Sequence, residues 1–263
     1  MPVSAEGQPA ADAESARLRI AAAGDVHCGE TTDRDALAAA FATAAEQVDL
    51  ILLAGDLTTH GEPEQAAILA GACRDLGVPV LTVLGNHDWH SNRRDELVAA
   101  LEGGGIDVID GGHRVLAVDG TEVGVAGVKG FVGGFPGSHM PDFGEPSLRA
   151  VYAEGAEEVA ALDAGLRAIA TCPFRIVLMH YAPTTETLVG ERRDIWAFLG
   201  TDRLAPPIVE HGPDVVLHGH AHAGTFEGRL GEVPVYNVSV PVLGQDFWIF
   251  SLSGAERMPS PIH

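Results

Sequence analysis

The chain has 263 residues, 46% of them apolar and only 6% aromatic, which suits a compact fold with a large core. Asp and Glu outnumber Lys and Arg by 37 to 16, so the formal net charge is −21, and Lys129 is the only lysine. This balance argues against a nucleic-acid polymer as partner, because neutralising phosphates supplies most of the affinity of such binders.

Residues 1–16 are small, polar and acidic, and they lack the basic start and apolar stretch of a signal peptide. We expect them to form a disordered tail. Three cysteines without a CxxC pair indicate no disulfide framework, as is usual in a reducing cytosol. The sequence contains no apolar span of 18 residues, so we expect no membrane helix. The sequence therefore predicts a cytoplasmic protein with a single domain over residues 17–263.

An alternation of strands and helices begins at Arg17. The apolar runs 17–24, 49–54 and 78–84 predict buried strands, and patterns typical of helices lie between them at 33–47 and 63–76. The order strand, helix, strand, helix, strand is typical of a right-handed parallel sheet.

The pattern changes after a short predicted helix at 93–101. Short runs at 106–109, 114–118 and 122–128 are separated by glycine-rich turns, which predicts hairpins and an antiparallel portion. Residues 129–146 hold five glycines, three prolines and three phenylalanines, so we interpret them as a loop or lid.

The later chain returns to longer elements. Helices are expected at 147–170 and 202–211, and strands at 174–179, 214–217, 223–229, 233–238 and 247–252. A mixture of parallel and antiparallel signals predicts an α/β fold in which two sheets pack face to face between helices.

Polar side chains that bind metals follow five of the predicted strands at the point where each strand ends. They are Asp25, Asp56, Asn86, His180 and His220. Ligands in parallel sheets bind at the carboxyl ends of the strands, and oxygen and imidazole donors are the usual ligands of divalent ions. Any one of these residues alone is more often a turn, a cap or a core residue. The set as a whole predicts a metal site.

In order, the chain shows D-x-H, G-D, G-N-H-D, H and G-H-x-H between about residues 20 and 238. This series resembles the calcineurin-like metallophosphoesterase superfamily. The resemblance implies a four-layer αββα sandwich of two mixed sheets, with a binuclear metal centre at the sheet edge. It implies a first metal held by Asp25, His27, Asp56 and His222. It implies that Asp56 bridges to a second metal held by Asn86, His180 and His220.

The donor set bears on the metal and on the chemistry. Carboxylate, amide and imidazole without thiolate favour Mn²⁺ or Fe, with Zn²⁺ also compatible. Two ions about 3.5–4 Å apart would acidify a bridging water, whose hydroxide attacks phosphorus in line. By the same resemblance, His87 protonates the leaving oxygen and Asp88 orients its ring.

Three further residues are candidates for substrate contacts. His60 follows the G-D motif and could reach the phosphate, and His90 follows G-N-H-D and could flank the leaving group. Arg193, beside Arg192, could clamp a phosphate oxygen. For His60 and Arg193, an exposed position on the protein surface is the alternative.

The predicted function is hydrolysis of a small phosphate ester. The G-D-x-V-D-R-G and G-N-H-E motifs of protein phosphatases are replaced by Gly55-Asp56-Leu57-Thr58-Thr59-His60-Gly61 and Gly85-Asn86-His87-Asp88. The chain is more similar to small bacterial phosphodiesterases of the cyclic-nucleotide type, so a phosphodiester is favoured over a metabolite monoester. The alternative from another class is a non-catalytic binding scaffold, which normally has lost ligands. The oligomeric state is left open.

Overall fold

The computed structural model describes residues 17–253. The tail expected at 1–16 and the last ten residues of the expected domain lie outside the described residues, so the predicted domain boundaries stay a prediction. Within the described range, no helix is both long and apolar enough to cross a membrane.

The first sheet has five strands in the order β11-β1-β2-β3-β4. Four of them are parallel neighbours: β1 (Arg17–Ala23), β2 (Leu50–Ala54), β3 (Val80–Val83) and β4 (Ile106–Val108). The last strand, β11 (Trp248–Ser253), pairs antiparallel with β1. Three crossover helices connect the parallel strands: α1 (Arg34–Ala45), α2 (Pro63–Ala72) and α3 (Arg94–Glu102). The predicted alternation of strands and helices is confirmed.

The second sheet has six strands in the order β5-β6-β7-β8-β10-β9. A hairpin is formed by β5 (Gly112–Val118) and β6 (Thr121–Val128), followed by parallel β7 (Phe174–Met179), β8 (Val215–His218) and β10 (Val233–Asn237). The edge strand β9 (Glu227–Leu230) is antiparallel to β10. The helices on this side are α4 (Pro146–Ala168) and α6 (Ala205–His211).

One strand expected among the hairpins belongs to the other sheet. Residues Ile106–Val108 form β4, which runs parallel to β3. Ile106 and Val108 pack toward the helices while Ile109 packs between the sheets. The preceding helix α3 returns the chain beside β3, so this run continues the βαβ pattern.

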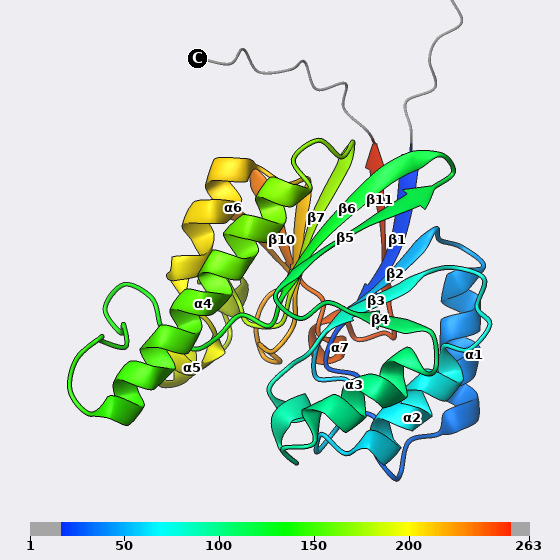
Figure 1. The fold of residues 1–263 in the computed structure, drawn as a ribbon, viewed down its shortest axis with the longest axis horizontal. Coiled ribbons are helices and arrows are strands. Elements are labelled where there is room, and N and C mark those ends of the chain that lie inside the picture. Colours follow the sequence, from blue (N-terminus) through cyan, green and yellow to red (C-terminus); the bar gives the residue numbers. More distant parts are fainter. Residues whose placement is uncertain (1–16, 254–263) are drawn as a thin grey trace, which may run out of the picture.

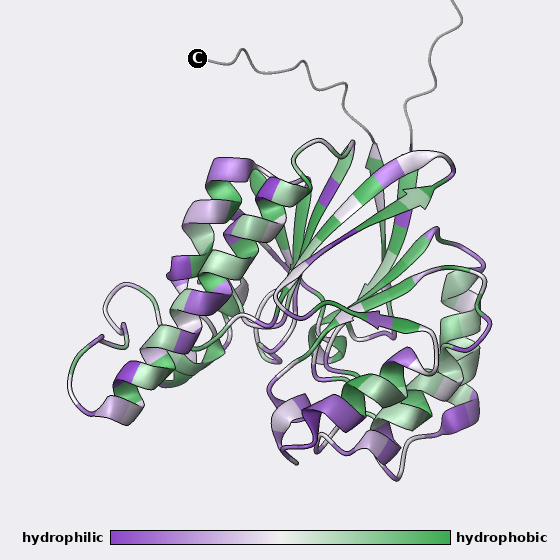
Figure 2. Ribbon diagram, viewed as in Figure 1, coloured by the Kyte–Doolittle hydropathy of each residue, from purple (hydrophilic) through white to green (hydrophobic). Residues whose placement is uncertain are grey.

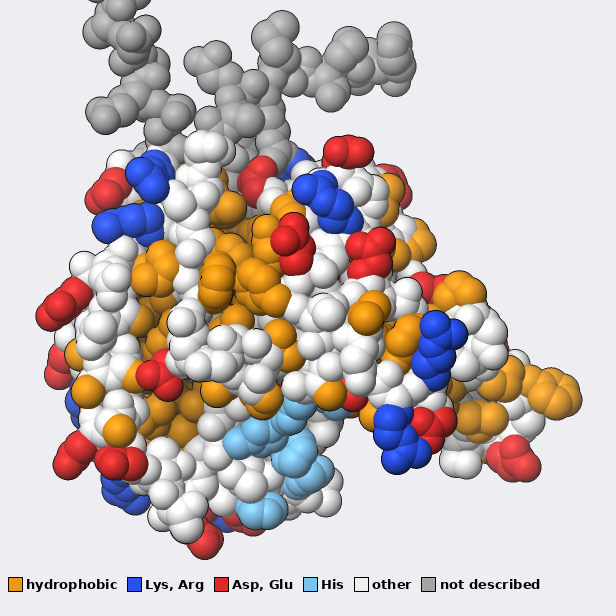
Figure 3. Space-filling view, turned by 180° about the vertical axis from the view of Figure 1, so that it is seen from behind, with side chains coloured by type: hydrophobic (Ala, Val, Ile, Leu, Met, Phe, Trp, Pro, Cys, Tyr) orange, Lys and Arg blue, Asp and Glu red, His pale blue; other side chains and the backbone are white. Residues whose placement is uncertain are grey.

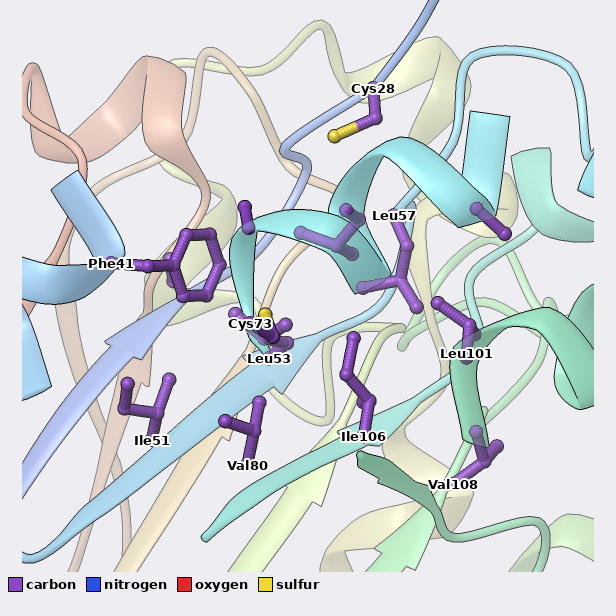
Figure 4. Close-up of a cluster of buried hydrophobic side chains, with 14 of the residues drawn as sticks. Cys28, Phe41, Ile51, Leu53, Leu57, Cys73, Val80, Leu101, Ile106 and Val108 are labelled. Carbon is purple, nitrogen blue, oxygen red and sulfur yellow. The ribbon is translucent and has the colours of Figure 1, made fainter. Parts of the chain in front are cut away.

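Three buried clusters separate four layers of structure (Figure 1). Phe41, Leu69 and Leu97 of the first three helices pack on Ile51 and Leu53 of β2, and Figure 4 shows part of this cluster. Leu50 and Leu52 of the same strand point to the opposite face, between the two sheets. The third cluster lies between the second sheet and α4 and α6. The predicted αββα sandwich is confirmed.

Hydropathy follows this layering. Figure 2 shows the most apolar residues along the strands, and polar residues alternating with apolar ones around the helices. Residues 129–145 form an irregular connection that ends where α4 begins, as expected, with one isolated bridge between Gly134 and Thr201. Its role as a lid stays a prediction. The short helices α5 (Trp196–Leu199) and α7 (Val240–Leu243) were not predicted.

Leu52→Ala is expected to lower the free energy of unfolding by about 2–5 kcal/mol, because Leu52 is fully buried between the sheets and its loss leaves a cavity. Urea denaturation followed by circular dichroism measures the change. Val115→Ala, at a residue 44% exposed on β5, is the control and should change stability by less than about 0.5 kcal/mol. Equal stability of both variants would contradict the assigned inter-sheet core.

Candidate active site

The strand-end residues converge on one edge of the sandwich. Asp25 and Asp56 follow β1 and β2 of the first sheet, and His180 and His220 follow β7 and β8 of the second. Figure 3 shows histidine side chains gathered in one group on the surface, beside a projecting lobe. Both sheets therefore contribute to a single site.

The donor atoms form three overlapping groups. They are Asp25, His27 and His222; His27, Asp56 and His87; and Asp56, His180 and His220, with the donor atoms of each group within 4.8 Å of one another. Asp56 links two groups through different oxygens. Its Oδ1 lies 3.3 Å from Nε2 of His180, and its Oδ2 lies 3.8 Å from Nε2 of His27. The two oxygens of Asp56 therefore face two different groups of donors.

The ring of His180 is oriented by a backbone carbonyl. Its Nδ1 donates to the carbonyl oxygen of Ala54 at 2.9 Å, so Nε2 is the nitrogen that can offer a lone pair to a metal. That Nε2 lies 2.9 Å from Oδ1 of Asn86, which is also an acceptor. A cation held by both atoms would satisfy both lone pairs, so the donor set fits a divalent metal.

Asp25 and His222 form the other end of the site. His222 Nε2 lies 2.7 Å from Asp25 Oδ1, and the backbone N–H of His220 donates to Oδ2 of Asp25 at 2.9 Å. Burial acts to raise the pKa of Asp25, but the hydrogen bond from His222 and the nearby imidazoles outweigh it and lower the pKa. Burial lowers the pKa of His27, and it lowers that of His220 to about 4. Neutral imidazoles are the form that binds metals.

Four of the candidate ligands have a left-handed backbone. The φ angles are 59° at Asp25, 47° at His27, 49° at Asp56 and 70° at His220. Positive φ is uncommon outside glycine, and residues held in such regions cluster at functional sites. The chain turns sharply after each strand, and this turn directs the side chain back to the sheet edge.

Two glycines allow the loops to approach the carboxylates. A Cβ on Gly85 would lie 2.1 Å from Oδ1 of Asp56, and one on Gly219 would lie 2.3 Å from Oδ2 of Asp25. Any side chain at these positions would displace the acidic groups. The glycines of the G-N-H-D and G-H-x-H motifs are therefore spatial requirements of the site.

A family model described as calcineurin-like phosphoesterase matches residues 18–224. The chain belongs to the calcineurin-like phosphoesterase family. It is accordingly a metal-dependent hydrolase of phosphoric esters, as the resemblance of its motifs implied. A search of curated proteins found no match.

Solved structures share the fold of this phosphoesterase at low sequence identity. A phosphopantetheinyl hydrolase from Mycobacterium tuberculosis has 19% identity and a TM-score of 0.60, covering 84% of this chain and 88% of its own. The TT1561 protein of Thermus thermophilus has 19% identity and a TM-score of 0.56, and the match covers 91% of this chain and 100% of that protein. A putative 5'-nucleotidase from Staphylococcus aureus has 13% identity and a TM-score of 0.56, and the match covers 94% of this chain and 56% of that protein. These similarities show the fold alone.

His87 faces the candidate metal centre of the phosphoesterase. Its Nε2 lies 4.0 Å from Oδ2 of Asp56, and its Nδ1 donates to the carbonyl oxygen of Thr59 at 2.8 Å. The prediction that Asp88 orients this ring was wrong, because the Thr59 carbonyl does so. Both residues lie in the 3-10 helix η1 (His87–Trp89), where successive side chains point in directions about 120° apart.

Asp88 instead fastens two loops together. Its fully buried carboxylate accepts hydrogen bonds from the backbone N–H groups of Leu57, Thr58 and Gly85 and from the Thr58 hydroxyl. Burial, followed by repulsion from Asp56, raises its pKa to about 6. Asp88 therefore holds the G-N-H-D loop against the G-D loop that carries Asp56.

The three candidate substrate contacts lie in different settings. The His90 ring lies 4.5 Å from that of His87, at the rim of the site. His60 is exposed, and its backbone N–H donates to the Gln65 side chain. Arg193 is exposed and lies over the Trp196 ring at 5.3 Å. Their roles stay predictions.

Two neighbours of the site were not singled out from the sequence. The Tyr181 ring lies 4.5 Å from that of His220, and the carbonyl oxygen of Phe198 accepts a hydrogen bond from His220 Nε2 at 3.1 Å. Tyr181 directly follows a motif histidine, a signal that could have identified it. Phe198 lies in no motif, so only the folded structure places it here.

Gly85→Ala is expected to abolish tight metal binding while the protein stays folded, because the new Cβ would overlap Asp56. Metal analysis after reconstitution with Mn²⁺, with circular dichroism as the test of folding, measures this. Gly71→Ala is the matched control, since a Cβ there meets nothing within 4 Å in helix α2. A Gly85→Ala protein with the metal content of the control would contradict the assigned geometry.

Proposed function

We propose that this phosphoesterase hydrolyses a small phosphodiester with two divalent cations, Mn²⁺ or Fe in preference to Zn²⁺. The observation that carries the proposal is the position of Asp56, whose two oxygens face two separate groups of imidazoles. Absence of thiolate donors supports the choice of metal, since the cysteines are buried and Cys28 packs in the core among apolar side chains.

The proposed ligands divide into two sets that share one carboxylate. The first ion would be held by Asp25, His27, Asp56 and His222, and the second by Asp56, Asn86, His180 and His220. When bound, such a pair supplies an activated water and neutralises charge on the phosphoryl oxygens.

His87 is the proposed general acid. Its Nδ1–H donates to the Thr59 carbonyl, so Nε2 is the nitrogen that faces the site and can carry a proton to the leaving oxygen. Its side chain is about one-third exposed, which leaves it accessible to a bound ester. His90 packs against it at the rim and is a proposed substrate contact together with His60 and Arg193.

Charge supports a diester over a monoester. A diester carries one negative charge at neutral pH, whereas a monoester carries about two. Outside the two proposed cations the surroundings are acidic, because the net charge is −21 and the one lysine is paired with two glutamates. A less anionic substrate suits these surroundings. The alternative is a phosphomonoesterase on a small metabolite. A binding scaffold is disfavoured because every ligand position is filled.

An activity panel tests the choice of substrate. The protein reconstituted with Mn²⁺ is expected to hydrolyse bis-p-nitrophenyl phosphate faster than p-nitrophenyl phosphate, and cyclic AMP tests whether a cyclic diester is accepted. Faster monoester hydrolysis would support the metabolite phosphatase instead. Failure on all three, with no Mn²⁺ bound, would support the scaffold.

His87→Ala is expected to retain both metals and to lose about 10²–10⁴-fold in turnover on an ester with a poor leaving group. The loss should be much smaller with p-nitrophenolate, which leaves without a proton. Steady-state kinetics on both kinds of ester measure the difference. His113→Ala, at an exposed residue of β5, is the control. Full activity of His87→Ala on the poor leaving group would remove His87 from the mechanism.

A further inference from the structure

Lys129, the only lysine of the chain, is buried directly after β6, beside the strand end that carries His180. Its ammonium lies 3.1 Å from Oε1 of Glu154 and 3.7 Å from Oε1 of Glu158, and both glutamates belong to α4. Burying an ammonium costs free energy unless opposite charges and hydrogen bonds offset the loss of water. The two glutamates supply this compensation, so the ion group joins α4 to the end of β6.

The backbone at Lys129 holds the segment that carries His180. The carbonyl oxygen of Lys129 accepts hydrogen bonds from the backbone N–H groups of His180 at 3.0 Å and of Tyr181 at 3.1 Å. On the other side, the N–H of Gly130 donates to Oε2 of Glu158 at 2.9 Å. The position of the His180 backbone therefore depends on a turn that is itself anchored on α4.

Three aromatic rings surround the ammonium of Lys129. It lies 4.0 Å from the ring centre of Phe131, 5.8 Å from that of Tyr181 and 6.0 Å from that of Trp89. These distances are within the range of about 6 Å over which a cation is attracted to a ring face. The ammonium thus contacts rings from three separate segments of the chain.

Two of these rings adjoin the residues proposed for the second ion. Tyr181 follows His180 directly, and its ring lies 4.5 Å from that of His220. Trp89 lies three residues after Asn86, and its backbone N–H donates to the Asn86 carbonyl. All three ligands that belong to the second ion alone are therefore linked to the surroundings of the ammonium.

The ligands that belong to the first ion alone have no such link. Within residues 17–253, the side chains of Asp25, His27 and His222 form no hydrogen bond, ion pair or ring contact with Lys129 or with the three rings. The two proposed metal positions thus differ in what supports them.

We propose that Lys129 is a positioning residue for the second ion. Its ammonium, held by Glu154 and Glu158, fixes the segments that present the ligands of that ion. The inference rests on the proposed function and deepens it, because the affinity for one of the two ions then depends on a side chain that binds neither.

Other roles of Lys129 predict different results. Removing an ammonium near the site would lessen the repulsion of both cations, so charge alone would make both bind more tightly. A role in stability alone would lower the free energy of unfolding without separating the two affinities. A selective loss of the second ion is therefore specific to positioning.

Titration of metal-free Lys129→Met with Mn²⁺, followed by electron paramagnetic resonance, tests the proposal. The first ion should bind as in wild type, and the second should bind about tenfold more weakly, a usual loss when a group that supports a metal ligand is removed. The exchange-coupled signal should accordingly need more Mn²⁺ to appear. Adding His222→Ala should weaken the ion that remains, because His222 belongs to the first set.

Arg149→Met, at an exposed residue of α4, is the matched control. It changes the net charge by the same amount and should bind both ions as wild type does. Glu154→Gln removes the shorter ion pair at a half-exposed side chain, so it should keep the fold and weaken only the second ion, by about threefold. Circular dichroism checks the folding of each variant.

If folded Lys129→Met bound the second ion with wild-type affinity, or weakened both ions equally, the positioning role would be overturned and the proposed hydrolase would stand. If Lys129→Met did not fold, wild-type affinity for the second ion in Glu154→Gln would overturn the role by itself. A wild-type protein that bound no Mn²⁺ would contradict the proposed function, and this inference with it.

Discussion

The carboxylate of Asp56 is the point on which the site depends. It is almost fully buried at the end of β2, and its two oxygens face imidazoles that come from different sheets. The backbone N–H of His87 donates to its Oδ1 at 2.8 Å. Burying a charged carboxylate costs free energy unless hydrogen bonds or opposite charges offset the loss of water. The loops around Asp56 bring a backbone N–H and imidazole rings to it.

The sandwich provides the geometry for this compensation. Parallel strands from both sheets end at the same edge, and the core between the sheets keeps these ends close together. Sharp left-handed turns at the ligands, with the close approach of Gly85 and Gly219, then bring the side chains inward. Stability of the apolar layers and geometry of the polar edge are therefore linked, because a shift of one sheet would separate His180 from Asp56.

Much of this architecture could be predicted from the sequence. Apolar runs that end in a polar residue, such as Leu50–Ala54 before Gly55 and Asp56, identify strands and the edge where they end. The motifs place seven candidate ligands that the structure brings together. Their role as ligands stays a prediction.

The errors arise where the outcome depends on contacts distant in sequence. The strand at Ile106–Val108 was placed with the hairpins because it is a short run among glycine-rich turns, whereas its parallel pairing with β3 assigns it to the first sheet. From the family resemblance Asp88 was expected to orient His87, but the turn of the 3-10 helix directs Asp88 inward, where it accepts a hydrogen bond from the backbone of Thr58. Phe198 reaches His220 across 22 residues, a contact that no local pattern predicts.

A titration of the metal-free protein with Mn²⁺, followed by electron paramagnetic resonance, tests the central claim most directly. The account predicts two ions per chain whose spectrum shows exchange coupling, because one carboxylate would hold them about 3.5–4 Å apart. Asp56→Ala should bind fewer ions and show no coupled signal. A wild-type protein that bound a single ion, or two ions without coupling, would contradict the claim that Asp56 joins two metals.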